Sequence, residues 1–395
     1  MKTHILQGAL LLLFMTICSR FVYAQMGDMP MMAATTKAQR PLTVPSNEST
    51  KEQLAFARAE GDSVDNCTAW IKAQCGNTGG QLRAGEYKLT YAVAAPEGWY
   101  TFNNAALSWS EPTTGTNAHF WLFIQDGADG RIVPPLDIKV AIRNQSGNLV
   151  EETTLPFAWM PLINGYGNNI TLPGTGTYSF IITIAVPSYH RHDPYNGDRF
   201  TEATTAVIPV TVSDMGSLPV LSKQMETQQM LSAKAGQAYA NTLKAMYKQA
   251  NDGRDTTSGD YFMAYAIEYS EGYWYENKGK LIYKTVNEMS SETNGHVEVS
   301  VRDNKTGRFM HNLNVTAALY NLQGKKIGTK MEMFMWHPWL YHYGENWRVA
   351  KGDKYNLHVH IDPPAYRRYG QTTGNQFSQP LDITFNNITI KTGQK

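Results

Sequence analysis

The sequence contains a long internal repeat, which restricts the possible folds more than any other feature. A constant shift of 177 residues aligns residues 117–200 with residues 294–377 without a gap, so that Asn117 matches Asn294 and Phe200 matches Phe377. Self-similarity that keeps its register over this length indicates a duplicated structural unit. The chain length also allows more than one domain. We therefore expect a first repeat over residues 42–215 and a second over 216–395.

Each repeat begins with an Ala-, Gln- and Lys-rich segment and continues as short alternating segments separated by Asx and Gly turns. The first pattern favours helices, which we expect over Lys51–Ala59 and Glu226–Ala250. The second favours strands, among them Leu136–Arg143, Ser179–Val186, Leu313–Tyr320 and Asn356–Ile361. The predicted fold is mainly β: two tandem antiparallel β-sandwiches, each preceded by a helical segment.

Residues 1–24 have the pattern of a secretory signal peptide. Lys2 precedes an apolar run over 9–15, and a small residue, Ala24, ends the segment. No later apolar run approaches the roughly 20 residues needed to span a bilayer. We expect an exported protein, either periplasmic or secreted.

Residues 25–41 are predicted to be a disordered, Met-rich linker. Four of its methionines are spaced like the motifs that hold Cu(I) in exported copper-handling proteins: Met26, Met29, Met31 and Met32. The alternative is a disordered tail that is merely rich in methionine.

Two cysteines, Cys67 and Cys75, follow the signal segment, and an export compartment would permit a disulfide between them. A continuous helix would place them about 12 Å apart, beyond bonding range. A bond would therefore require a break in the helix.

Several function classes are disfavoured. The formal net charge is +1 and no basic cluster is present, so nucleic acid is not an expected partner. The sequence also lacks GxSxG, HExxH and paired-carboxylate patterns, and we do not expect an enzyme.

One window, 294–346, is rich in metal-binding side chains. These are His296, Glu298, Met331, Met333, Met335, His337 and His342. Residues two apart on a strand share a face, so His296 and Glu298 could reach one ion. The combination of imidazole, carboxylate and thioether suits copper, although alternate methionines can simply fill a sandwich core.

The equivalent window of the first repeat keeps only the first of these donors, His119. Glu298 is replaced by Trp121, and Met335 by Ala158. His337 and His342 are replaced by Met160 and Gly165. Only the second repeat is therefore predicted to hold a complete ligand set.

The order of motifs in the second repeat resembles a known family. H-x-E is followed by M-x-M, then by H-Y-G and a proline-rich loop before G-x-x-F. This resembles the periplasmic iron-uptake-associated copper-binding proteins, the iron transport-associated antigen or lipoprotein type, here as a tandem duplication. These are immunoglobulin-like β-sandwich proteins, often encoded beside an iron permease. The resemblance implies metal ligands at His296, Glu298, Met335 and His342.

The resemblance leaves the number of ligands from each repeat open. The family places a further histidine in a late loop, where the second repeat has Tyr369 and the first has His190 and His192. Because family members are typically homodimers, the two repeats could form an intrachain pseudo-dimer with one composite site. Alternatively, the second repeat could hold an independent four-ligand site. Met333, His337, His119, His190 and His192 are therefore possible additional ligands.

The leading functional hypothesis is an exported protein that binds copper, with iron or zinc as other possible metals. It would support iron or copper uptake by delivering metal to a membrane permease. The runner-up is a carbohydrate-binding or adhesion module that uses Trp336, Trp339, Tyr341 and Tyr343 to stack on sugars. A purely structural protein without metal is a third possibility.

Overall fold

The structure is a computed structural model that describes residues 43–103, 106–133, 135–289, 292–350, 352–390 and 392. These residues belong to one compact unit, 39–395. The expected signal peptide and the Met-rich segment with Met26, Met29, Met31 and Met32 lie outside the described residues. Among those described, no helix is both long and apolar enough to cross a membrane.

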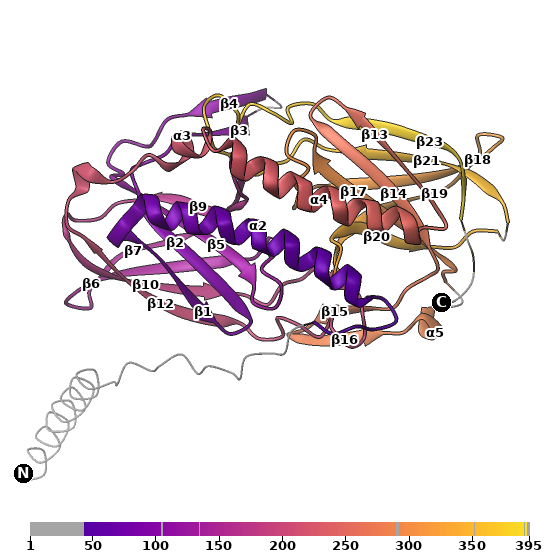
Figure 1. Ribbon diagram of the computed structural model, residues 1–395, viewed down its shortest axis with the longest axis horizontal. Helices are drawn as coiled ribbons and strands as arrows, with labels where there is room; N and C mark the ends of the chain where they lie inside the picture. Colours follow the sequence, from indigo (N-terminus) through magenta and orange to yellow (C-terminus); the bar gives the residue numbers. More distant parts are fainter. Residues whose placement is uncertain are drawn as a thin grey trace, which may run out of the picture. The chain divides into compact units, whose positions relative to one another are not determined.

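Two long helices, α2 (Lys51–Cys75) and α4 (Gln229–Gln249), lie side by side (Figure 1). A capping box begins α2, in which Thr50 and Gln53 satisfy each other's backbone N–H groups. The helix is longer than predicted because it continues through Gly61. A side chain at position 61 would collide with the carbonyl oxygen of Asp129, so glycine allows the turn there to pack directly on the helix. Two short helices are α3 (Leu221–Met225) and α5 (Val286–Met289).

Cys67 and Cys75 are both in α2, buried and unbonded. The unbroken helix keeps the two thiols apart, and burial raises the pKa of Cys67 to about 11. They are structural residues of the interface between α2 and the first sheet.

The described residues of the first repeat form these strands: β1 (Gly79–Ala84), β2 (Tyr87–Ala94), β3 (Trp99–Asn103), β4 (Ala106–Ser110), β5 (Ala118–Asp126), β6 (Ile138–Asn144), β7 (Leu149–Thr154), β8 (Phe157–Trp159), β9 (Gly165–Ile170), β10 (Gly176–Ile184), β11 (His190–Arg191) and β12 (Thr204–Val212). The second repeat contributes β13 (Asp252–Ser258), β14 (Tyr261–Glu268), β15 (Tyr273–Asn277), β16 (Lys280–Lys284), β17 (Gly295–Asp303), β18 (Val315–Asn321), β19 (Lys326–Trp336), β20 (His342–Trp347), β21 (Lys354–Ile361), β22 (Arg367–Arg368) and β23 (Leu381–Thr389). The strands predicted from sequence are confirmed with shifts of a few residues at their ends.

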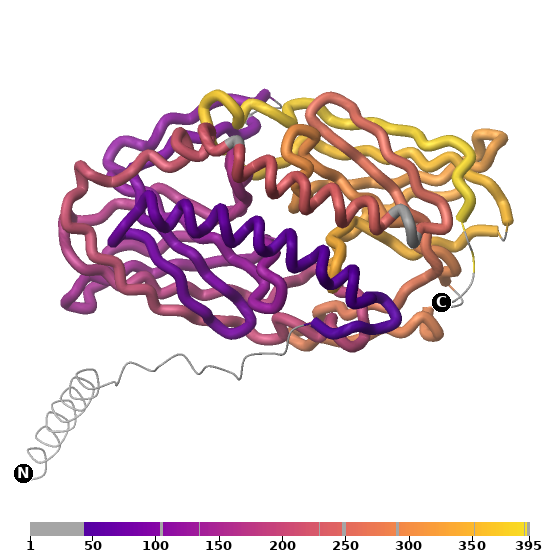
Figure 2. Tube along the Cα trace, in the orientation of Figure 1, coloured from indigo at the N-terminus to yellow at the C-terminus, as the bar shows by residue number. Residues whose placement is uncertain are grey.

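The two repeats have the same strand order. The first builds one sheet in the order β1-β2-β5-β9-β8-β22-β3-β4 and a second in the order β12-β10-β6-β7. The second repeat follows with β13-β14-β17-β20-β19-β11-β15-β16, while β18, β21 and β23 continue from the far part of β19. This repetition confirms the predicted pair of immunoglobulin-like β-sandwiches, which Figure 2 traces in magenta and in orange to yellow.

Each repeat donates one short strand to the sheet of the other. The first repeat's β11 lies between β19 and β15, where His190 pairs with Met335 and Arg191 with Trp336. In the reciprocal exchange, β22 lies between β8 and β3, with Arg367 paired to Ala158. The exchange places the loop after β11, which begins with His192, against the second repeat.

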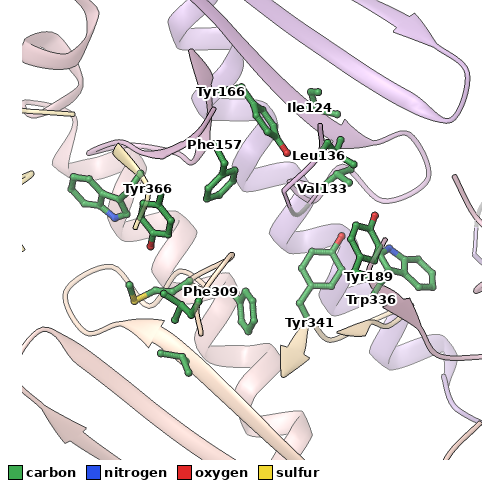
Figure 3. Packing of buried hydrophobic residues seen from close by; sticks show 14 of the residues in the cluster. Ile124, Val133, Leu136, Phe157, Tyr166, Tyr189, Phe309, Trp336, Tyr341 and Tyr366 are labelled. Atoms are coloured by element: carbon green, nitrogen blue, oxygen red, sulfur yellow. The ribbon is translucent and has the colours of Figure 1, made fainter. Parts of the chain in front are cut away.

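Buried aromatic side chains from both repeats form one continuous core where the strands are exchanged (Figure 3). The Phe157 ring lies 5.5 Å from that of Tyr366, a residue of the other repeat. The guanidinium of Arg131 stacks 4.0 Å from the ring centre of Tyr341 and donates a hydrogen bond to the carbonyl of His337. These contacts fix the ligand-rich segment of the second repeat against the first.

Candidate metal centre

Four of the predicted ligands lie on one face of the second repeat's sheet. His296 and Glu298 are two apart on β17, and their partners on β20 are Asn346 and Gly344. His342, two residues before Gly344, is directly opposite Met335 of β19. Directly paired residues of antiparallel strands point to the same side, so the strand pairing brings all four ligand positions together.

Gly344 provides the space between the two imidazoles of this sheet. A side chain there would meet Nε2 of His296 at 2.7 Å and Cδ2 of His342 at 3.0 Å. Only glycine leaves both rings room to face the same point.

The first repeat supplies a third imidazole. The backbone N–H of His192, just after β11, donates to the carbonyl of Trp336 at 2.8 Å. The His192 ring centre lies 5.4 Å from that of His342 and 5.2 Å from that of His296. All three histidines are fully buried, and ligand atoms from the three lie within 4.8 Å of one another. The geometry is therefore composite, with imidazoles from both repeats.

Hydrogen bonds determine which nitrogen of His296 faces the cluster. The side-chain nitrogen of Asn346 donates a hydrogen bond to the carbonyl oxygen of Glu271, and Oδ1 of Asn346 accepts one from the backbone N–H of Glu271. These two bonds fix the orientation of the amide, so that Oδ1 faces His296. Nδ1 of His296, 3.0 Å from that oxygen, must therefore be the protonated nitrogen. Nδ1 of His192 likewise donates to the carbonyl of Gly272 at 3.0 Å. In both rings Nε2 carries the lone pair that a metal requires.

Two buried carboxylates adjoin the imidazoles. Oε1 of Glu298 lies 3.8 Å from Nε2 of His342, which makes no hydrogen bond within the described part of the chain. Glu271, His296 and Glu298 form a second group with ligand atoms within 4.8 Å of each other, and Glu48, His192 and Glu271 form a third. The histidines thus border a group of three glutamate side chains.

The sequence did not indicate Glu48 or Glu271 as site residues. Glu271 lies in the loop after β14 and Glu48 precedes α2, so neither shares a strand pattern with the ligands. The one available signal was the recurrence of Glu97-Gly98 as Glu271-Gly272 at equivalent points of the two repeats.

The other predicted ligands differ in their positions. Met335 is buried opposite His342, whereas Met333 is 37% exposed. His337 is buried with Nε2 3.9 Å from Oε2 of Glu48, and its ring centre is 5.9 Å from that of His192. His190 stacks on Tyr273 instead of joining the three histidines. His119 lies in the equivalent region of the first repeat.

Its buried position favours the neutral state of His342. Burial lowers the pKa of His342 well below its ordinary value, and the nearby His192, His296 and His337 lower it further. A neutral imidazole is the form that binds metal, so protons compete weakly at neutral pH.

A small pocket adjoins this cluster at His342. Its lining includes four glutamates, Glu48, Glu268, Glu271 and Glu298, together with His337, Trp339 and His342. Carboxylates along such a pocket would attract a cation toward the imidazoles. The donor set of three imidazoles, carboxylates and a nearby thioether position fits a transition-metal ion.

Comparison with known families identifies the class of protein. The model of the family described as Fe2+ transport protein matches residues 125–212 and 263–390, which together are more than half of the chain. The chain belongs to this family and contains its unit twice.

Solved structures give weaker likenesses. Copper-bound variants of FetP from uropathogenic Escherichia coli and of P19 from Campylobacter jejuni are 21% and 15% identical, with TM-scores of 0.29 and 0.27. The matches cover 91% and 98% of those chains but only 35% and 34% of this one. A search of curated proteins gives no significant match.

Proposed function

We propose that this chain is an exported protein that binds copper at the composite centre and supports the uptake of iron or copper by passing metal to a membrane permease. The observation that carries the proposal is the convergence of His192, His296 and His342, all buried, with Glu298 beside them. Membership of an iron-transport family supports the uptake role.

Copper is favoured over other metals by the chemistry of the donors. Imidazole nitrogens bind copper strongly, and copper has the highest affinity of the divalent first-row metals for such sites. A thioether at Met335 would favour Cu(I), whereas Glu298 would favour Cu(II) or a ferric ion. A donor set of this kind accommodates a change of oxidation state.

The carbohydrate-binding alternative loses its main support in the structure. The aromatic side chains that would have to stack on sugars, Trp336, Trp339, Tyr341 and Tyr343, are all buried. They pack in the protein interior, as the Tyr341 ring does beneath Arg131.

Metal analysis and calorimetric titration test the binding proposal. The full chain, exported to the periplasm and purified without chelators, should contain copper or take up one tightly bound Cu(II) per chain, with Zn(II) bound more weakly. A glycan panel serves as the negative control. Binding of Cu(II) that is no tighter in the wild type than in His342→Ala would contradict the assignment.

The uptake role needs a separate readout. Cells that lack the chromosomal gene would be complemented with the wild type or with His342→Ala and supplied with radioactive iron under iron limitation. We expect the variant to restore less uptake. Equal uptake with a variant that no longer binds copper at the composite centre would reject a transport role for that centre, and the binding proposal would stand.

A further inference from the structure

A second group of metal-binding side chains lies on the outer face of the other sheet of the second repeat. His358 and His360 are two apart on β21, and Asp382 of β23 is the direct partner of His360. Val359, which lies between the two histidines, is fully buried. Because side chains alternate along a strand, His358 and His360 point outward, as does Asp382, the partner of His360. The side chains of His358, His360 and Asp382 are 36%, 38% and 57% exposed.

One carboxylate oxygen lies between the two imidazoles. Oδ1 of Asp382 is 2.9 Å from Nδ1 of His360 and 3.4 Å from Nε2 of His358. Two ligands at about 2.1 Å from one ion lie about 3.0 Å apart at a right angle and about 3.4 Å apart at a tetrahedral angle. Both separations fall in the range of neighbouring ligands of one ion, and both are also hydrogen-bond or ion-pair contacts, so a proton occupies this place in the metal-free protein.

A second carboxylate orients the central ring. Oδ1 of Asp362 is 3.2 Å from Nε2 of His360, so this nitrogen can donate to it. In the metal-free protein Nδ1 of His360 can donate to Oδ1 of Asp382 at 2.9 Å, so a bound cation would displace this proton while Nε2 keeps the proton that faces Asp362. A carboxylate behind a histidine is the usual means of fixing a metal-binding tautomer.

We propose that His358, His360 and Asp382 form a second, solvent-open site for a divalent transition-metal ion of the Cu(II) or Zn(II) class, with Asp362 as the residue that orients His360. On metal binding, rotation of these exposed side chains would bring Nε2 of His358, Nδ1 of His360 and Asp382 around one ion, and water would complete the coordination. Because the ligands are exposed and few, this site binds more weakly and exchanges metal faster than the composite centre.

The first repeat shows that the fold does not require these residues. Its equivalent strands, β10 and β12, carry Ile181 in place of His358, and Thr183 paired with Thr205 in place of His360 and Asp382. The same outward face therefore exists without donors. His358, His360 and Asp382 are therefore not required for these strands to fold.

Titration of four full-length proteins with Cu(II) and with Zn(II) separates the two sites. The wild type should bind in a tight and a weaker class. His358→Gln/His360→Gln should lose the weaker class alone, and His342→Ala the tight class alone. Thr384→Ala, a change on the same outward face opposite His358, is the matched control and should keep both.

Electron paramagnetic resonance gives an independent test of the ligands of the weaker site. After the first Cu(II) equivalent has filled the tight site, the spectrum that the second equivalent adds reports on the weaker one. We expect nitrogen hyperfine coupling from two imidazoles in the wild type and none in the double variant. Retention of the weaker class in His358→Gln/His360→Gln, or a single class in the wild type, would overturn the proposal. Neither result would affect the composite centre, which has its own variant.

Discussion

Two equivalent centres, one in each repeat, share the same strand arrangement and supporting hydrogen bonds but differ in the side chains that face one another. The histidine centre consists of His192, His296, Glu298, Met335 and His342. The aromatic centre has Tyr369, His119, Trp121, Ala158 and Gly165 at the corresponding positions. In each, one residue arrives from the other repeat through an exchanged strand. The comparison separates what the fold supplies from what a few side chains decide.

The supporting hydrogen bonds are the same in both centres. Nδ1 of His119 lies 2.7 Å from Oδ1 of Asn169, which also accepts from the N–H of Glu97 at 3.0 Å, while its amide donates to the carbonyl of Glu97 at 2.9 Å. This repeats the contacts of His296, Asn346 and Glu271. The first repeat therefore still orients its histidine as a metal-binding residue.

The space that faces His119 is filled with aromatic rings. The ring centres of Trp121 and Tyr369 lie 4.1 Å and 5.3 Å from that of His119, and all three side chains are fully buried. Trp121 and Tyr369 join an apolar cluster with Ala158 and Met160. Replacing ligands by rings turns a polar centre into ordinary core, and the hydrogen-bond frame remains.

The largest expected difference between the centres concerns their imidazoles. His342→Ala should weaken Cu(II) binding at the tight site by more than about 100-fold, because it removes a donor, not merely a supporting contact. His119→Ala should leave Cu(II) affinity unchanged. Calorimetric titration of both variants, after circular dichroism has established that they fold, checks the pair. Copper loss in the His119 variant would mean that the aromatic centre also binds metal.

The residues contributed across the repeats give the next largest difference. His192→Ala should weaken Cu(II) binding by about 10–100-fold or more, since its ring faces both His296 and His342. Tyr369→Phe, the equivalent change in the aromatic centre, should have no effect on affinity. If His192→Ala binds copper as the wild type does, the second repeat holds an independent site.

The shared asparagines test whether the frame matters for metal. Asn346→Ala should lower Cu(II) affinity by about tenfold, because His296 loses the acceptor that fixes its tautomer. Asn169→Ala should leave copper binding unchanged. Both should reduce the free energy of unfolding by about 1–3 kcal/mol, since buried backbone groups of Glu271 or Glu97 lose their partners. Chemical denaturation of the apo proteins measures this second effect.

The duplication was predictable from the constant shift between the repeats, and the β-sandwich class and the shared face of His296 and Glu298 from local periodicity. His296 and Glu298 share a face through i, i+2 spacing, and this relation survives any arrangement of the sheets. The contribution of Glu271 was not predictable, since it depends on where a loop packs in three dimensions. The choice between His190 and His192 depended on the exchanged strand: His190 lies within it and stacks on Tyr273, whereas His192 follows it and faces His296.

Helix α2 shows another limit of sequence reasoning. The predicted helix ended at Ala59, before Gly61, and glycine lowers helix stability by about 1 kcal/mol relative to alanine. The structure shows a close contact between Gly61 and the turn at Asp129, so tertiary packing explains the residue. The same cause applies to Gly236 in α4, which meets the carbonyl of Thr306.

The smallest expected effect concerns the pH dependence of stability at the aromatic centre. Burial lowers the pKa of His119 to about 3, with a hydrogen bond to Asn169 acting in the opposite direction. In the unfolded chain this histidine titrates near pH 6.5. Between these values the unfolded state binds a proton that the folded state does not, so acidification from pH 6.5 toward 3 destabilises the protein.

His119→Gln removes this contribution and keeps an amide that can still donate to Asn169. Relative to the wild type, the variant should become progressively more stable as the pH falls from 6.5, by at most about 1.4 kcal/mol per pH unit. Urea denaturation of both proteins at pH 7.5, 6.0 and 5.0 measures the difference between their free energies of unfolding. Because both proteins contain the other buried histidines, the contributions of those residues cancel in this difference. A difference that does not change with pH would mean that the rings around His119 admit a proton, and that the aromatic centre is less completely apolar than its packing indicates.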